Sequence, residues 1–115
     1  MTIEIWHNPR CSKSRETLAL LEQKNINADI YLYLQSKPDA DAIKAVLSKL
    51  GITARELLRN SEEAYKVQNL KDKTLSDAQL IQAMVQEPKL IQRPIVINGE
   101  QARLGRPPED VLEIL

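Results

Sequence analysis

The sequence predicts a single α/β domain over residues 1–115, with a four-stranded mixed sheet and helices on both of its faces. Three observations predict this fold. Residues 2–34 have the patterns of a strand, a helix and a second strand, and approximately residues 39–90 have helical periodicity. Residues 94–115 then supply two strands joined by a tight turn and a last helix. We therefore expect a helical insertion between the second and third strands.

The first two strands and the helix between them form one βαβ unit. Residues 2–6 alternate in polarity and carry β-branched or aromatic side chains, which is typical of a strand. From Ser12 the pattern becomes that of an amphipathic helix, and the unbroken apolar run from Ile30 to Leu34 predicts a buried strand. The turn after the first strand then lies at the carboxyl edge of the sheet, where open α/β sheets bind their ligands.

Capping residues divide the middle block into separate helices. Asp39 is suited to the N-cap of a helix that ends at Gly51. Thr53 caps a short helix that ends at Arg59, and Ser76 repeats the capping signal before the next long helix. Each of these helices has its own start signal, so we interpret the block as a set of short helices.

The last part of the chain returns to the sheet. Residues 94–97 form an apolar strand, and Asn98-Gly99 is a strong signal for a two-residue hairpin turn. Residues 101–104 would be the returning strand. Residues 106–109 then open a last helix, with proline near its first position and an acidic residue in its first turn.

The composition disfavours several classes of partner and site. Sixteen basic and 16 acidic residues cancel, and four aromatic residues offer little stacking surface, so we expect no nucleic-acid partner. No apolar run approaches the roughly 20 residues that a bilayer requires, and the N-terminus does not resemble a signal peptide. One cysteine and one histidine are too few for a zinc site, so we expect no metal. A lone cysteine forms no internal disulfide, and the expected location is the cytoplasm.

Cys11 is the candidate nucleophile because it begins the first helix. The first turn of a helix presents unpaired N–H groups and the positive end of the helix dipole, which favour an ionised sulfur. A lone cysteine is more often a small core residue, but the polar and cationic neighbours here, among them Arg10 and Lys13, disfavour burial. A four-stranded mixed sheet with a thiol at this turn is the thioredoxin or glutaredoxin arrangement.

Two polar neighbours could act on this thiol. Ser14 follows Cys11 by one helical turn, so its hydroxyl could donate to the sulfur. His7 is either a polar residue that ends a strand or a cationic or donor neighbour of the thiol, and the sequence alone leaves both readings open.

Several arginines could receive an oxyanion beside the thiol. Arg59 ends a short helix, where an ordinary surface role is the alternative, and Arg93 precedes Pro94, a candidate for a cis peptide bond. Arg103 and Arg106 flank the last strand. Guanidinium groups bind a tetrahedral oxyanion through bidentate, charge-assisted hydrogen bonds that lysine cannot reproduce.

Four motifs, in order along nearly the whole chain, resemble the glutaredoxin-linked arsenate reductase family. They are His-Asn-Pro-x-Cys-x-x-Ser-Arg-x-Thr-Leu at 7–18, Leu-Leu-Arg at 57–59, Arg-Pro-Ile-Val at 93–96 and Arg-Leu-x-Arg-Pro at 103–107. The resemblance implies a thioredoxin-like fold with a helical insertion and a role in arsenic detoxification. It implies Cys11 as nucleophile, Arg59, Arg93 and Arg106 as oxyanion-binding residues, and His7 and Ser14 as activators of the thiol.

The resemblance also implies the partners of the reaction. The substrate would be arsenate or a similar oxyanion. No cofactor would be bound, and glutathione would be the co-substrate because the chain has no second cysteine. Glutaredoxin would then reduce the mixed disulfide and reset the enzyme.

Two other functions fit the same residues. The first is a glutathione-dependent thiol-disulfide oxidoreductase, for which the arginines would matter little. The second is a redox-responsive regulator similar to the Spx type, which binds RNA polymerase. Such regulators commonly use a Cys-x-x-Cys switch, and Ser14 stands where the second cysteine would be.

Overall fold

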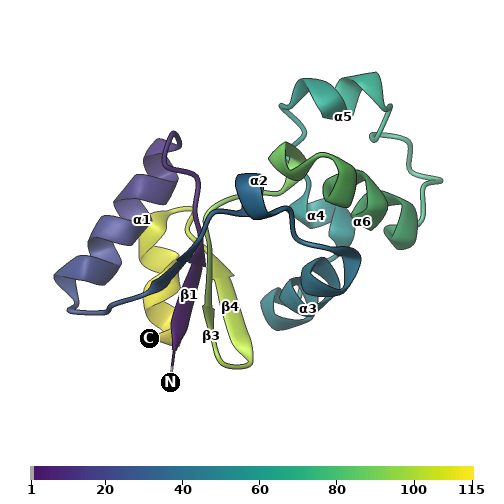
Figure 1. The fold of residues 1–115 in the computed structure, drawn as a ribbon. Coiled ribbons are helices and arrows are strands. Elements are labelled where there is room, and N and C mark those ends of the chain that lie inside the picture. The colour runs from purple at the N-terminus through teal and green to yellow at the C-terminus, as the bar shows by residue number, and fades with distance from the viewer. Residues whose placement is uncertain (1) are drawn as a thin grey trace. The chain divides into compact units, whose positions relative to one another are not determined.

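Four strands form one mixed sheet in the order β2-β1-β3-β4 (Figure 1). Strand β1 pairs parallel with β2 and antiparallel with β3, and β3 pairs antiparallel with β4. This arrangement confirms the predicted fold class. The strands are β1 (Ile3–Trp6), β2 (Asp29–Tyr31), β3 (Ile95–Asn98) and β4 (Gln101–Leu104).

The computed structural model describes residues 2–115, and the chain divides into two compact units. The first, which we call the sheet unit, comprises the chain up to Ser36 and from Arg93 onwards. The second, the helical unit, comprises Lys37–Gln92, between β2 and β3, where the insertion was predicted. A single domain over residues 1–115 stays a prediction.

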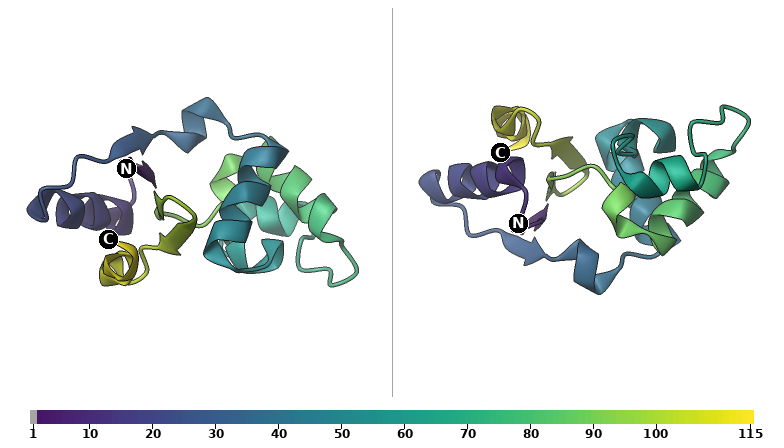
Figure 2. Two further views of the ribbon diagram at one scale, coloured as in Figure 1. Left: turned by 90° about the horizontal axis from the view of Figure 1, so that it is seen from below. Right: turned by 90° about the horizontal axis from the view of Figure 1, so that it is seen from above.

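In the sheet unit, α1 (Ser12–Gln23) and the 3-10 helix η2 (Pro108–Ile114) cover one face of the sheet (Figure 2). The register places Ile5 opposite Val96, so both side chains point to this face. They form a core with three residues of the two helices, namely Leu21, Val111 and Ile114, and all five are at most 4% exposed. Full burial of such a side chain contributes about 1.5–3 kcal/mol. The last helix was predicted correctly in place, but it has 3-10 geometry.

The second strand was predicted wrongly in length and burial. Strand β2 ends at Tyr31, and the short helix α2 (Tyr33–Ser36) follows. Ile30 is 51% exposed, because β2 is an edge strand with a neighbour on one side only. The buried residue of the apolar run is Tyr33, whose ring stacks on Trp6 with centroids 6.2 Å apart. Tyr33 thus packs its ring on Trp6 from α2, and it is not paired in a strand.

The predicted hairpin is present, but its turn is shifted by one residue. Asn98 pairs with Gln101 as the last residue of β3, and the two turn residues are Gly99, with φ +63°, and Glu100. Asn98 stays in the strand because its Nδ2 donates a hydrogen bond of 2.6 Å to the carbonyl oxygen of Ile114. The hairpin thereby holds the end of η2.

The helical unit is built from four α-helices and one 3-10 helix among the described residues. They are α3 (Ala40–Leu50), α4 (Ala54–Leu57), α5 (Glu63–Val67), α6 (Asp77–Gln86) and η1 (Pro88–Leu90). The predicted caps are confirmed. Asp39 accepts from the N–H of Ala42, Gly51 ends α3 with φ +70°, and Thr53 and Ser76 each form a capping box.

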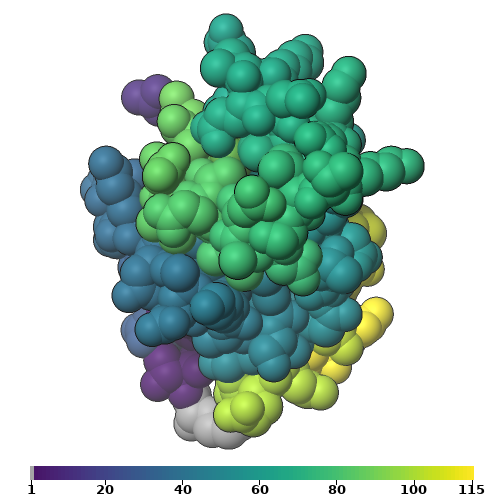
Figure 3. Space-filling view, turned by 90° about the vertical axis from the view of Figure 1, so that its right-hand side faces the viewer, coloured from purple at the N-terminus to yellow at the C-terminus, as the bar shows by residue number. Residues whose placement is uncertain are grey.

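One helix of this unit is shorter than predicted. Helix α4 ends at Leu57 and does not reach Arg59. Leu58 instead forms a β-bridge with Ile91, and the N–H of Arg59 donates to the carbonyl oxygen of Leu90. These pairings across the unit extend the chain after Leu57. Figure 3 shows the surface of this unit in blue to green, with the region of α5 in teal.

No helix formed by residues 2–115 is long and apolar enough to cross a bilayer.

Candidate active site

Cys11 occupies the N-cap of α1, at the turn that joins β1 to this helix (Figure 1). Its N–H donates to the carbonyl oxygen of Asn8 at 3.0 Å, and its own carbonyl oxygen accepts from the N–H of Arg15 at 3.0 Å. The sulfur therefore lies at the positive end of a 12-residue helix. The expectation of an exposed cysteine was wrong, because the residue is only 9% exposed.

Arg106 contacts the sulfur of Cys11. Its Nη2 lies 3.9 Å from Cys11 Sγ, and its Nε donates a 2.9 Å hydrogen bond to the carbonyl oxygen of Arg93. The carbonyl fixes one edge of the guanidinium while another edge faces the thiol. The contact places a cationic hydrogen-bond donor next to the sulfur. The buried thiol thus contacts a charged side chain and is not surrounded by apolar side chains alone.

A close approach of two backbones brings Arg106 to the thiol. The N–H of Gly105 donates to the carbonyl oxygen of Pro94 at 3.0 Å. A Cβ on Gly105 would lie 2.7 Å from Pro94 Cγ and would overlap Thr17 Oγ1, so no larger residue fits without a shift. Thr17 is fully buried in α1, and its hydroxyl donates to the carbonyl oxygen of Lys13. Glycine at 105 therefore lets the end of β4 pack against the thiol helix.

The peptide bond before Pro94 is cis, as the sequence predicted, and the Arg106–Pro107 bond is also cis. Sequence reasoning assigned no function to Gly105 or Thr17. The available signal was a glycine between Leu104 and Arg106, directly after a predicted strand.

His7, Ser14 and Asn8 form a buried polar network beside Cys11. His7 Nδ1 lies 2.7 Å from Ser14 Oγ, which also accepts the N–H of Asn8 at 3.0 Å. His7 is 6% exposed and Ser14 is fully buried. Burial, and then the positive charge of Arg15, lower the pKa of His7 below its ordinary value. The ring is therefore neutral at pH 7.

The tautomer of His7 decides what the Ser14 hydroxyl can do. A hydroxyl has one proton to donate and two lone pairs to accept with. If His7 Nδ1 carries the proton, Ser14 accepts from both His7 and Asn8, and neither of these contacts uses the proton of its own hydroxyl. If Nδ1 is bare, the Ser14 proton goes to the ring.

The two arginines near the end of the chain, Arg103 within β4 and Arg106 after it, have different contacts. Arg103 Nε lies 3.2 Å from Glu113 Oε2, and its Nη1 donates to the carbonyl oxygen of Ala102. Arg103 thus ties β4 to η2. The guanidinium of Arg106, by contrast, lies next to the sulfur.

Arg59 belongs to the helical unit. Its Nη1 forms an ion pair of 2.7 Å with Glu62 Oε2, and its side chain is 17% exposed. The predicted role of Arg59 toward the thiol stays a prediction. Within residues 2–115, no three His, Cys, Asp or Glu side chains are gathered where they could hold a metal ion.

Comparison with known proteins gives consistent matches. The model of the ArsC family matches residues 6–114. The chain is 53% identical over 114 residues to the uncharacterized protein YfgD of Escherichia coli K12, covering 98% of this chain and 96% of that protein. It is 52% identical over 116 residues to a Haemophilus influenzae protein named arsenate reductase, with 100% of both chains covered. The solved structure of an arsenate reductase from Vibrio cholerae superposes with a TM-score of 0.98 at 52% identity, covering 100% of this chain and 98% of that one.

Proposed function

This chain belongs to the ArsC family, as its four motifs predicted, and from this premise we propose that it is an arsenate reductase. One observation carries the proposal. The Arg106 guanidinium lies 3.9 Å from the Cys11 sulfur and is oriented by the Arg93 carbonyl oxygen. A nucleophile and an oxyanion-binding fork are therefore side by side. The relatives named arsenate reductase support arsenate as the oxyanion.

The first step belongs to Cys11. Its thiolate attacks the arsenic(V) atom, an arsenic–sulfur bond forms, and one arsenate oxygen leaves as water after taking up protons. Arg106 stabilises negative charge on the remaining oxygens in the ground state and in the transition state. Arg93 and Arg59 are the other two oxyanion-binding residues of this proposal.

Glutathione supplies the second thiol, because Cys11 is the only cysteine of the chain. Its sulfur attacks the Cys11 sulfur of the adduct, and a disulfide forms as the arsenic–sulfur bond breaks. The electron pair of that bond stays on arsenic, which leaves as arsenite(III). Glutaredoxin then reduces the mixed disulfide. We assign the chain to the cytoplasm, where glutathione keeps thiols reduced.

His7 and Ser14 act on the thiol in this scheme. A neutral His7 with its proton on Nδ1 leaves the Ser14 proton for the sulfur, so the pair stabilises the thiolate before arsenate binds. After the attack, the same hydroxyl remains a neutral hydrogen-bond partner. The lowered pKa of His7 supports this role, because a charged ring would no longer have a choice of tautomer.

A second candidate is a glutathione-dependent thiol-disulfide oxidoreductase. The observation in its favour is the ion pair between Arg59 and Glu62, which occupies a guanidinium that arsenate would need. An enzyme of this second kind needs only the thiol and the polar network around it.

Turnover of the purified protein separates the two candidates. With glutathione and glutaredoxin, we expect reduction of arsenate to exceed reduction of bis(2-hydroxyethyl) disulfide. Cys11→Ser should abolish arsenate reduction while the thermal unfolding curve stays unchanged, since the 3.9 Å contact of the sulfur with Arg106 is too long to contribute much to stability.

Two further variants sharpen the result. Arg93→Lys and Arg59→Lys keep the charge but lose the fork, so each should weaken arsenate binding by about 1–3 kcal/mol. Unchanged arsenate kinetics in both variants would favour the thiol-disulfide oxidoreductase.

A further inference from the structure

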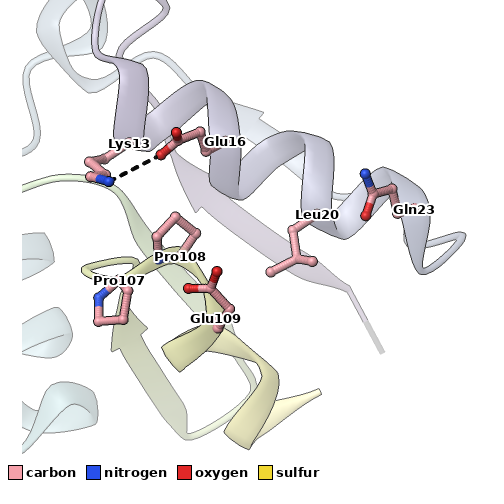
Figure 4. Close-up of a pocket in the computed structure, with 7 residues that line it drawn as sticks. All are labelled: Lys13, Glu16, Leu20, Gln23, Pro107, Pro108 and Glu109. Carbon is pink, nitrogen blue, oxygen red and sulfur yellow. Dashed lines mark ion pairs between the residues drawn. The ribbon is translucent and has the colours of Figure 1, made fainter.

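A groove of about 390 Å³ lies between α1 and the start of η2, within the sheet unit (Figure 4). Its walls are Lys13, Glu16 and Leu20 on α1 and residues 107–109 on the other side. Positions 13, 16 and 20 are spaced by three and four residues, so their side chains share one face of the helix. Nothing in the scheme above uses this groove.

Both walls of the groove begin close in sequence to the site residues. On one wall, Lys13 comes two residues after Cys11. On the other wall, Pro107 directly follows Arg106, whose Nη2 lies 3.9 Å from Cys11 Sγ. Of the lining residues, Lys13 and Pro107 are therefore the nearest along the chain to the two residues of this contact.

The charges in the groove match an α-amino acid group. Lys13 Nζ lies 3.4 Å from Glu16 Oε2, and the two side chains are 45% and 55% exposed. Such an exposed pair is worth about 0–1 kcal/mol, so Lys13 can exchange Glu16 for a ligand carboxylate at little cost. Glu16 and Glu109 then offer carboxylates to an ammonium group from opposite walls.

The rest of the lining suits the carbon chain of such a ligand. Leu20 on α1 and the two prolines opposite, Pro107 and Pro108, add apolar surface to the lining (Figure 4). The two carboxylates, Glu16 and Glu109, would repel an inorganic anion bound at Lys13. The same three charged side chains would be costly to bury under a fatty chain. A small zwitterion satisfies both parts of the lining.

We propose that this groove holds the γ-glutamyl end of glutathione while its sulfur reacts at Cys11. The inference rests on the proposed function, in which glutathione is the second thiol. From its sulfur to its γ-glutamyl α-carbon, extended glutathione spans roughly 9 Å, whereas Glu16 lies about 7.5 Å along the helix axis from Cys11. The α-amino acid group therefore reaches Lys13 and the two carboxylates.

A thiol-disulfide exchange reaction tests the groove without arsenate. The Cys11 thiolate attacks one sulfur of oxidised glutathione, the disulfide bond breaks, Cys11 forms a mixed disulfide, and a glutathione thiolate leaves. The rate is followed by mass spectrometry for oxidised glutathione and, separately, for uncharged bis(2-hydroxyethyl) disulfide. Because this reaction does not involve arsenate, it tests the groove even if the protein does not reduce arsenate.

The informative variant is Glu16→Gln with Glu109→Gln. Oxidised glutathione is a net anion, so removal of two negative charges would speed its reaction if only long-range attraction mattered. Loss of specific ammonium binding should instead slow it about tenfold, while the reaction with bis(2-hydroxyethyl) disulfide stays unchanged. Glu22→Gln, on α1 but outside the groove, is the matched control and should react like the parent protein. An equal or faster reaction of the double variant with oxidised glutathione would overturn the proposal.

Discussion

The helix caps of the helical unit and the thiol site of the sheet unit depend on interactions of different range along the sequence. In the helical unit, Ser76 and Gln79 cap α6 across three residues, and Thr53 and Glu56 cap α4 in the same way. In the sheet unit, the contact that defines the site joins Cys11 to Arg106, which are 95 residues apart. Changes at the Cys11–Arg106 contact should therefore alter chemistry, and changes at the helix caps of the helical unit should alter stability.

The largest effect is expected from Arg106, which follows β4, with Arg103, which lies within β4, as its comparison. Arg106→Lys keeps the charge but loses the fork that faces the thiol, so kcat/KM for arsenate should fall about 10- to 100-fold, or about 1–3 kcal/mol. Arg103→Lys should leave kcat/KM nearly unchanged, because Arg103 is paired with Glu113 away from the sulfur. Steady-state kinetics of both variants test this expectation. An equal loss of kcat/KM in the two variants would contradict a specific role of Arg106 at the thiol.

A glycine-to-alanine substitution in each unit allows a direct comparison of its effects on stability and on activity. Gly105→Ala should destabilise the protein by about 1–3 kcal/mol through overpacking against Pro94 and Thr17. It should also lower kcat/KM, because Arg106 follows in the chain. Gly51→Ala meets no atom within 4 Å but must adopt φ +70°, so it should cost about 1–2 kcal/mol of stability and no activity.

Urea unfolding and arsenate kinetics on the two glycine variants give the comparison. If Gly51→Ala lost as much activity as Gly105→Ala at equal stability, the expectation that only the substitution next to Arg106 lowers kcat/KM would be wrong.

A smaller effect is expected from a helix cap. Ser76→Ala removes the side chain that accepts the N–H of Gln79, so the free energy of unfolding should fall by about 1 kcal/mol. Arsenate kinetics should not change. Ser76→Asp, which keeps an accepting oxygen, is the control and should retain most of the stability in a urea titration.

The subtlest effect is a dependence of stability on pH. The pKa of His7 is lowered in the folded protein, by burial first and by Arg15 second. As pH falls below the ordinary value of 6.5, the unfolded chain takes up a proton that the folded protein does not. The free energy of unfolding should therefore fall with pH and level off below the folded pKa.

Urea unfolding between pH 5 and pH 8 measures this slope. In His7→Gln the slope should be smaller, because the titrating ring is absent. A slope that is identical in the parent protein and in the variant would contradict the assignment of a neutral, buried His7.

The signals that predicted the fold correctly are local ones. Asp39, Thr53, Ser76 and Gly51 act on residues within one helical turn, so the sequence around them suffices. The run from Ile30 to Leu34 was misread because its structure depends on the stacking of Tyr33 on Trp6. The hairpin turn shifted for the same reason, since the partner of Asn98 is Ile114, 16 residues away.

The candidate site shows the same division. Cys11, His7 and Ser14 come from one strand-to-helix turn, and their proximity follows from spacing alone. The roles of Arg93 and Arg106 came from a resemblance, because no local pattern says which arginine meets a thiol 95 residues earlier. Thr17 and Gly105 were missed because their importance lies in the space between them, which a sequence does not display.

The contact between Arg106 and Cys11 should also make the reactivity of the thiol depend on the charge of the reagent. Electrophiles must pass a positively charged side chain to reach a residue that is only 9% exposed. Anionic reagents are drawn to that charge, whereas neutral ones gain nothing from it. Iodoacetate should thus compete unusually well with iodoacetamide at this sulfur, and bulky uncharged maleimides should label it slowly.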